Sequence, residues 1–145
     1  MQGPASILLI DDQDDEALLV RRAIADTGYT GELSAVQSVM SARKYLESDA
    51  GPFIKLVLLD LKFPGPSGFD FLKWRGESSF SNRIPTVVLS NSDSQTDICQ
   101  AYDLGANSYL NKPVSFTEFK DLIAAAISYW IDVNELPNDN GFGEL

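Results

Sequence analysis

Residues 7–12, with the sequence Ile-Leu-Leu-Ile-Asp-Asp, join a run of four apolar residues directly to two carboxylates. Two more runs have the same form: residues 56–59 end at Asp60, and residues 87–89 end at Ser90. Continuous apolar runs of this length, bounded by polar residues, are typical of strands buried on both faces of a parallel sheet. They predict a sheet in which a polar side chain follows each central strand.

Two further strands and five helices are predicted around these runs. Residues 32–36 alternate between polar and apolar, as a strand nearer a sheet edge does, and residues 108–110 fit a fifth strand. Apolar residues at helical spacing predict helices after Gln13, Ser38, Gly68, Ser92 and Ser115. Strict alternation of strand and helix predicts an α/β fold: a doubly wound, five-stranded parallel sheet with five helices on its two faces.

The ends of two helices carry recognisable signals. Ser92 with Gln95, and Ser115 with Glu118, have the spacing of a capping box at the start of the fourth and fifth helices. Gly105 is expected to end the fourth helix, because glycine adopts the left-handed backbone conformation found just after many helices.

The composition limits the functions of the chain. Its 145 residues fit one domain, predicted over residues 1–131, followed by an acidic tail over residues 132–145. The absence of histidine excludes histidine-dependent catalysis, and the single cysteine, Cys99, excludes an internal disulfide and is expected to pack on the fourth helix. A net charge of -10 disfavours nucleic acid and anionic membranes as partners. With no transmembrane run or signal peptide found, we expect a cytoplasmic protein.

Polar residues at the strand ends form the candidate site. In open α/β sheets, ligands bind at the carboxyl ends of the strands. There the sequence places Asp11 and Asp12, Asp60, Ser90, and finally Lys112, which lies between Asn111 and Pro113. Crowded carboxylates attract a cation, and Mg²⁺ prefers such oxygen ligands. Asp60 could then act as a nucleophile that forms an aspartyl phosphate, with Lys112 contacting a phosphate oxygen.

Each of these residues also has a purely structural interpretation. Asp11, Asp12 and Asp60 could be turn residues, Lys112 a surface lysine, and Ser90 an N-cap. The set of strand-end groups taken together favours the phosphate and metal interpretation. Three other acids, at positions 14–16, fall in the first turn of the first helix, where they favour the helix dipole, and no role in the site is expected of them.

The ordered set resembles the receiver domains of response regulators, the CheY-like superfamily with a flavodoxin-like fold, over roughly residues 6–130. Three stretches carry the resemblance: residues 58–61 with Pro64 and Gly68, residues 87–90, and residues 104–113, whose sequence Leu-Gly-Ala-Asn-Ser-Tyr-Leu-Asn-Lys-Pro is the most specific match. The resemblance implies a phosphoacceptor signalling domain that catalyses its own phosphorylation and dephosphorylation, rather than a classical enzyme.

The resemblance implies a role for individual residues. Asp60 matches the phosphorylated aspartate and Lys112 the phosphate-contacting lysine. Ser90 and Tyr109 match the switch pair, although Tyr109 could equally be a half-buried aromatic residue. The implied Mg²⁺ ligands are the carboxylates of Asp11, Asp12 and Asp60 and the backbone carbonyl of Lys62. The sequence departs from the family pattern at Ser90, in place of the commoner threonine, at Lys62, and at residues 66–67.

The C-terminal part is closer still to receivers that partner phytochrome-type histidine kinases. Residues 92–93, 97–98, 129–130 and 136–137 carry this second resemblance. It implies a histidine kinase as partner and a homodimer, in which the tail would be an extended arm and Tyr129, Trp130 and Leu136 the anchors. Whether the Lys112–Pro113 bond is trans, as most such bonds are, or cis, as the resemblance suggests, is left open.

Other functions are weighed against a single-domain response regulator of a two-component phosphorelay, whose downstream target the sequence does not identify. An aspartyl phosphatase of the haloacid dehalogenase type also forms an aspartyl phosphate, but it needs a second aspartate where Lys62 stands. A nucleotide-binding module is disfavoured because no glycine-rich phosphate loop occurs. A non-phosphorylated receiver scaffold is a further alternative, against which the complete acid set argues.

Overall fold

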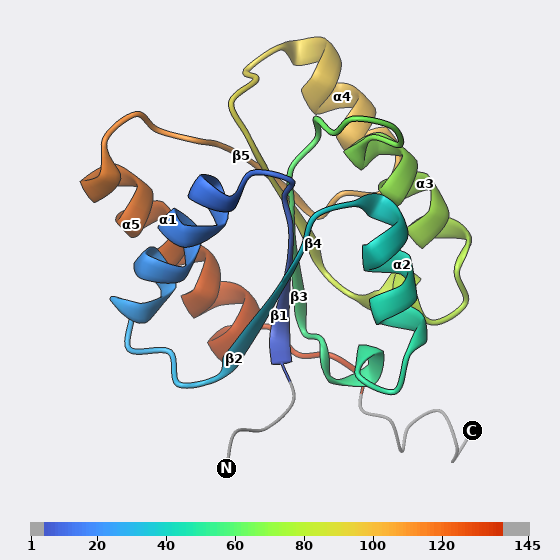
Figure 1. The fold of residues 1–145 in the computed structure, drawn as a ribbon, viewed down its shortest axis with the longest axis horizontal. Coiled ribbons are helices and arrows are strands. Elements are labelled where there is room, and N and C mark those ends of the chain that lie inside the picture. Colours follow the sequence, from blue (N-terminus) through green and yellow to red (C-terminus); the bar gives the residue numbers. More distant parts are fainter. Residues whose placement is uncertain (1–4, 138–145) are drawn as a thin grey trace.

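The structure, a computed structural model, describes residues 5–137 and contains one sheet flanked by helices (Figure 1). The five strands are β1 Ala5–Ile10, β2 Glu32–Val36, β3 Leu56–Leu59, β4 Thr86–Ser90 and β5 Ser108–Asn111. The five α-helices are α1 Asp14–Ala25, α2 Val39–Glu47, α3 Gly68–Glu77, α4 Gln95–Asp103 and α5 Phe116–Ile127. Three short turns of other helix types are η1 Gly51–Phe53, η2 Ser81–Arg83 and η3 Ser128–Val133.

All strand pairs are parallel, and the strand order is β2-β1-β3-β4-β5. The chain therefore runs from β1 out to one edge and then back past β1 to the other edge, which confirms the predicted doubly wound sheet. A sheet of this kind has a switch point between β1 and β3, where the connections leave in opposite directions. The carboxyl ends of β1 and β3 consequently border the same crevice.

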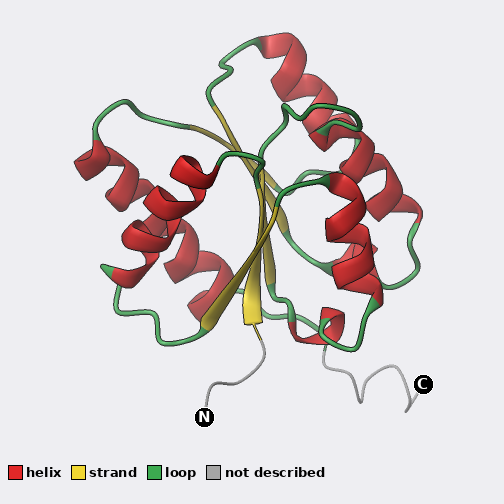
Figure 2. Cartoon of the chain, viewed as in Figure 1, coloured by secondary structure: helices red, strands yellow, loops and turns green. Residues whose placement is uncertain are grey.

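Two clusters of buried apolar side chains, one on each face of the sheet, pack the sheet against its helices. Alternate residues of β1 point to opposite faces: Ile7 and Leu9 join a cluster with α1 and α5, whereas Leu8 and Ile10 join one with α2 and α3. Figure 1 shows the same division, with α1 and α5 on one side of the sheet and α2, α3 and α4 on the other, and Figure 2 shows the helices as two outer layers. Burial on both faces explains why the central strands are continuously apolar.

Helix α4 begins two residues later than the sequence analysis predicted. Its N-cap is Ser94, whose hydroxyl accepts from the backbone N–H of Asp97, so the predicted capping box of Ser92 with Gln95 is wrong. The hydroxyl of Ser92 instead donates to the Asp97 carboxylate at 2.6 Å. At the other end Gly105 has a φ of 101°, which confirms its predicted role as the stop.

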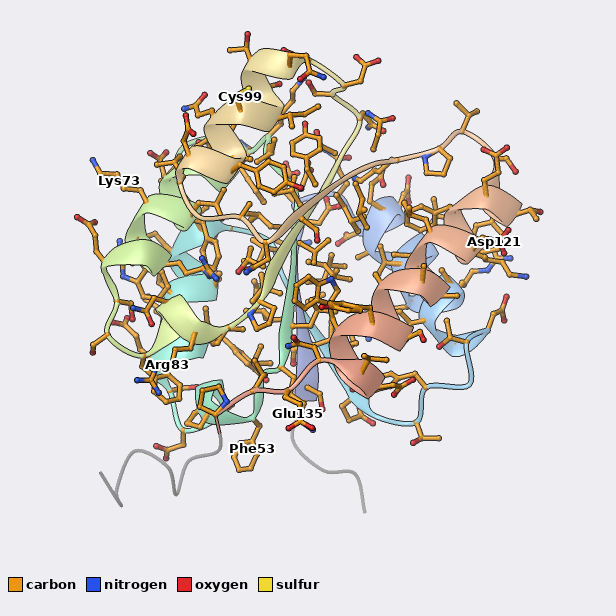
Figure 3. All side chains as sticks on the ribbon, turned by 180° about the vertical axis from the view of Figure 1, so that it is seen from behind. Phe53, Lys73, Arg83, Cys99, Asp121 and Glu135 are labelled. Atoms are coloured by element: carbon orange, nitrogen blue, oxygen red, sulfur yellow. The ribbon has the colours of Figure 1, made fainter. Side chains whose placement is uncertain are left out.

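Helices α3, α5 and α4 each bear on a further prediction. A full capping box formed by Ser67 and Asp70 begins α3, and the sequence analysis missed it. At α5, the Ser115 hydroxyl accepts from the Glu118 N–H, as expected of the N-cap. Cys99 is exposed on α4 rather than packed, which corrects the prediction for that residue (Figure 3).

The chain continues from α5 into η3, a π-helical turn, and the N–H of Asn134 donates to the Tyr129 carbonyl at 2.7 Å. The description ends at Pro137, so residues 138–145 of the predicted tail over residues 132–145 lie outside the described residues. Within residues 5–137, no helix combines the length and the apolar character needed to cross a bilayer.

Candidate functional site

Three carboxylates meet where β1 and β3 end. Asp11, Asp12 and Asp60 each offer an oxygen, and these oxygens lie within 4.8 Å of one another. Hydrogen bonds past the strand ends fix the backbone here: the N–H of Asp11 donates to the Val36 carbonyl, and that of Asp60 to the Ile10 carbonyl, each at 3.0 Å. The sheet itself therefore brings Asp60 to two acids that precede it by 48 residues or more in sequence.

Burial makes this cluster electrostatically costly. Asp11 is 3% exposed, and burial raises the pKa of its carboxyl to about 6, despite a hydrogen bond from the Gln13 N–H and the attraction of Lys112. Burial also raises the pKa of Asp60, against the opposing influence of Lys112 and of two backbone N–H groups. A divalent cation would relieve this cost, and a set of carboxylate oxygens suits Mg²⁺. The residues therefore fit the expected metal.

Lys112 reaches the cluster from the end of β5. Its side chain is 7% exposed, and its Nζ lies 3.2 Å from Glu16 Oε2 and 3.7 Å from Asp11 Oδ2. Its own N–H donates to the Ser90 carbonyl at 2.8 Å, which continues the β4–β5 ladder. The described residues contain no cis peptide bond, so the Lys112–Pro113 bond is trans.

The side chains of Ser90 and Tyr109 both hydrogen-bond to the backbone of Ser92. Ser90 is 1% exposed, and its hydroxyl accepts from the N–H of Ser92 at 3.0 Å. The carbonyl of Ser92 accepts from the Tyr109 hydroxyl at 2.7 Å. Tyr109 is half-buried and packs against the apolar layer beneath α4. The backbone of Ser92 is therefore joined to Ser90 on one side and to Tyr109 on the other.

A hollow of about 480 Å³ opens above these groups. Its lining includes most of the predicted site residues, namely Asp12, Asp60, Lys62, Ser90 and Lys112. Asp11 lies buried beside it. The side chain of Lys62 is exposed, in the loop that directly follows Asp60. The hollow has both the location and the charged groups needed to admit a small anion beside Asp60.

The three predicted interface residues lie at the other end of the molecule. Trp130 and Leu136 line a second hollow of about 450 Å³, which also contains Lys55, at the start of β3 (Figure 3 labels Arg83 and Glu135 at this end). Trp130 is half-buried and packs against the α1–α5 layer. Tyr129 is 51% exposed, with its ring edge-on to that of Trp130.

Glu16 is a site residue that the sequence analysis missed. It was assigned only to the helix dipole, yet its carboxylate accepts a hydrogen bond from Lys112 and lines the hollow above Asp60. Its neighbours Asp14 and Asp15 are exposed, as that interpretation expects. The available signal was positional: the first turn of a helix that begins at a strand end faces the same rim.

Comparison with known proteins identifies the fold and its family. Residues 7–124 match the model of the response regulator receiver domain. The chain belongs to the response regulator receiver family. It is 34% identical over 139 residues to the probable methanogenesis regulatory protein FilR2 of Methanothrix harundinacea, covering 94% of this chain and 90% of that protein.

Two solved receiver structures are similar over almost their whole length. The phosphorylated cyanobacterial phytochrome response regulator RcpA has a TM-score of 0.84 at 28% identity, covering 94% of this chain and all of that one. The Mn²⁺-bound form of response regulator Rcp1 has a TM-score of 0.81 at 28% identity, covering 92% and 99%. Receiver domains are signalling domains that bind Mg²⁺ at an acidic cluster of this kind, and histidine kinases phosphorylate them. The family predicted from the strand-end residues is thereby confirmed.

Proposed function

We propose that this receiver accepts a phosphoryl group from a histidine kinase onto Asp60, in a Mg²⁺-dependent reaction, as a single-domain response regulator of a phosphorelay. The observation that carries the proposal is the meeting of three carboxylates beside a buried lysine, at the switch point of the sheet. Phosphoryl transfer needs positioning and charge neutralisation above all, and this rim provides groups for both.

The chemistry follows from the charges of the site. A carboxylate oxygen of Asp60 attacks phosphorus; the new P–O bond forms as the P–N bond to the donor's phosphohistidine breaks, and the imidazole leaves. The carboxylates of Asp11, Asp12 and Asp60 and the backbone carbonyl of Lys62 would hold Mg²⁺, which neutralises phosphoryl charge when bound. Lys112 would contact a phosphoryl oxygen.

A direct test uses a small phosphodonor. Acetyl phosphate with Mg²⁺ should add the mass of one phosphoryl group to the intact protein, and Asp60→Asn should remain unmodified. Equal modification of Asp60→Asn, or modification that does not depend on Mg²⁺, would contradict the assignment. An unmodified wild-type chain would favour the alternative of a non-phosphorylated scaffold. The phosphatase alternative is disfavoured by Lys62, which occupies the position where that class of enzyme needs a second aspartate.

We further propose that Ser90 and Tyr109 transmit the phosphorylated state. Ser90 would turn toward a phosphoryl oxygen and give up the hydrogen bond from Ser92, which releases the loop before α4. Beryllofluoride, a mimic of the acyl phosphate, should then shift NMR signals over residues 91–104 and at Tyr109. Shifts confined to the loop after Asp60 would contradict this role.

For partners, we propose a phytochrome-type kinase, a homodimer and a cytoplasmic location. The likeness to RcpA, a cyanobacterial phytochrome response regulator, supports the kinase. The exposed ring of Tyr129 and the apolar lining formed by Trp130 and Leu136 support the C-terminal end as the dimer surface. Light scattering should show a dimer for the full chain and a smaller species for a chain ending at Asp132. A monomeric full chain, phosphorylated or not, would overturn the dimer.

A further inference from the structure

Glu16 is the acceptor that holds Lys112 in the resting site. The Nζ to Oε2 distance is 3.2 Å and meets hydrogen-bond geometry, whereas Asp11 Oδ2 lies farther away, at 3.7 Å. The pair joins residues 96 positions apart, from the first turn of α1 and the end of β5. Because the side chain of Lys112 is 7% exposed, water competes weakly for the ammonium.

The contact matters because both partners line the hollow above Asp60. An ammonium donates through three N–H groups, and each one directed at Glu16 is turned away from an incoming anion. A phosphoryl group placed beside Asp60 would also meet the negative charge of Glu16 in the same hollow. Glu16 therefore opposes the anion in two ways, by holding the lysine and by repelling the anion.

We propose that Glu16 is a positioning residue that competes with the phosphoryl group for Lys112 and so lowers the affinity of the site for that group. The inference rests on the proposed phosphorylation of Asp60. Phosphorylation then requires Lys112 to exchange the Glu16 carboxylate for a phosphoryl oxygen, and hydrolysis of the acyl phosphate allows the ion pair to re-form. Glu16 thereby biases the receiver toward its unphosphorylated state.

The experiment measures the affinity for beryllofluoride at saturating Mg²⁺ in the full chain, by titration followed with ¹⁹F NMR. Glu16→Gln keeps the shape of the side chain and removes its charge. It should bind beryllofluoride about two- to fivefold more tightly than the wild type, the range expected when a partly exposed ion pair no longer competes. Acetyl phosphate should also phosphorylate Glu16→Gln faster than the wild type.

The matched control is Asp15→Asn, which removes one negative charge from the adjacent position of the same helical turn, at an exposed side chain. It should change beryllofluoride affinity less than about twofold, because exposed charges are screened. Mg²⁺ affinity measured without beryllofluoride should be similar in the two variants, since neither residue belongs to the carboxylate cluster. A change in beryllofluoride affinity without a matching change in Mg²⁺ affinity distinguishes competition for Lys112 from a general effect of charge.

The outcomes are distinguishable. Equal beryllofluoride affinity in Glu16→Gln and Asp15→Asn would overturn the inference and leave the proposed function intact. Weaker binding by Glu16→Gln than by the wild type would also overturn it, because Glu16 would then orient Lys112 for the phosphoryl group rather than compete with it. A wild-type chain that binds no beryllofluoride in Mg²⁺ would overturn the proposed function, and this inference with it.

Discussion

Arg75 and Lys112 are cations buried at opposite ends of the same sheet, and their partners differ in kind. Arg75 is 5% exposed and donates to three neutral oxygens: the carbonyls of Ile84 and Gly105 and the side-chain oxygen of Asn107, at 2.9–3.0 Å. Lys112 instead lies among carboxylates beside an open hollow. The guanidinium has its hydrogen bonds satisfied inside the fold, whereas the ammonium can exchange one anion for another.

The difference separates a structural end of the sheet from a reactive one. Around Arg75, fixed hydrogen bonds join α3 to the starts of β4 and β5, and the side-chain oxygen of Asn107 also accepts from the Thr86 N–H at 2.8 Å. Around Lys112, burial leaves Asp11 and Asp60 with raised pKa values, so their ionised carboxylates carry a cost that a bound cation would relieve. Removing one group at a time tests this contrast.

The largest effect is expected at the structural end. Arg75→Met should lower the free energy of unfolding by about 3–5 kcal/mol, because it removes three charge-assisted hydrogen bonds to buried or partly buried acceptors. Chemical denaturation measures the change. Arg22→Met is the matched control: Arg22 is exposed on α1 and stacks over the Phe116 ring, so the loss should stay near 1 kcal/mol or less. Equal losses in the two variants would mean that the Arg75 network adds nothing beyond an ordinary surface contact.

At the reactive end, removing a charged group should raise the free energy of unfolding instead of lowering it. Asp11→Asn keeps an oxygen for the Gln13 N–H and removes the buried charge, so without metal at pH 8 it should raise the free energy of unfolding by about 3 kcal/mol. Because the folded-state pKa of Asp11 is raised from 3.8 to about 6, the wild-type penalty is complete above pH 6 and disappears as the pH falls toward 4.

The difference between Asp11→Asn and the wild type should therefore shrink between pH 6 and pH 4. Measuring this difference, rather than the wild type alone, cancels the titration of the other acids. Asp15→Asn, at an exposed position, should show no comparable dependence. A gain at Asp11 that persisted unchanged at pH 4 would show that burial of its charge is not the cause.

These contrasts also indicate what the sequence could reveal. The sheet and its rim were predictable, because the strands are short apolar runs that end at Asp11, Asp60 and Ser90, and parallel strands bring their carboxyl ends together. Family membership followed from the same residues. The structural end was not predictable: Arg75 lies in a helix where a charged residue would normally face water, and its acceptors are backbone carbonyls that carry no sequence signal.

The errors at the site have a similar cause. Ser92 and Ser94 both suit the start of a helix, and local sequence does not choose between them. The choice is made by tertiary contacts, since the backbone of Ser92 is held by Ser90 on one side and Tyr109 on the other. Glu16 was assigned to the helix dipole because its partner lies 96 residues away, in a different strand. Pairings at such separation follow from the assembled sheet and not from any local pattern.

Binding of Mg²⁺ should change the free energy of unfolding less than either Arg75→Met or Asp11→Asn does. Mg²⁺ at ten times its dissociation constant should stabilise the wild type by about 1.4 kcal/mol, because it binds the folded state alone. The thermal unfolding midpoint measured with and without Mg²⁺ should rise for the wild type and for Glu16→Gln, and should change little for Asp11→Asn, which loses a ligand of the carboxylate cluster. Equal stabilisation of Asp11→Asn would place the metal outside this cluster.

The smallest effect on stability is expected from the hydrogen bond between the Tyr109 hydroxyl and the Ser92 carbonyl. Tyr109→Phe removes the hydroxyl that donates to the Ser92 carbonyl and keeps the half-buried ring, so it should cost about 1 kcal/mol of stability or less. If that hydrogen bond exists in the resting arrangement alone, its loss favours the phosphorylated arrangement, and beryllofluoride should bind up to about fivefold more tightly. Tyr102→Phe, at an exposed tyrosine on α4, should alter neither quantity.

A stability loss at Tyr109 without any change in beryllofluoride affinity would identify the residue as a packing aromatic, the interpretation that the sequence left equally open. Tighter binding together with that loss would instead show that the hydrogen bond restrains the switch, and that the reactive end is held in its resting state by contacts much weaker than those of Arg75.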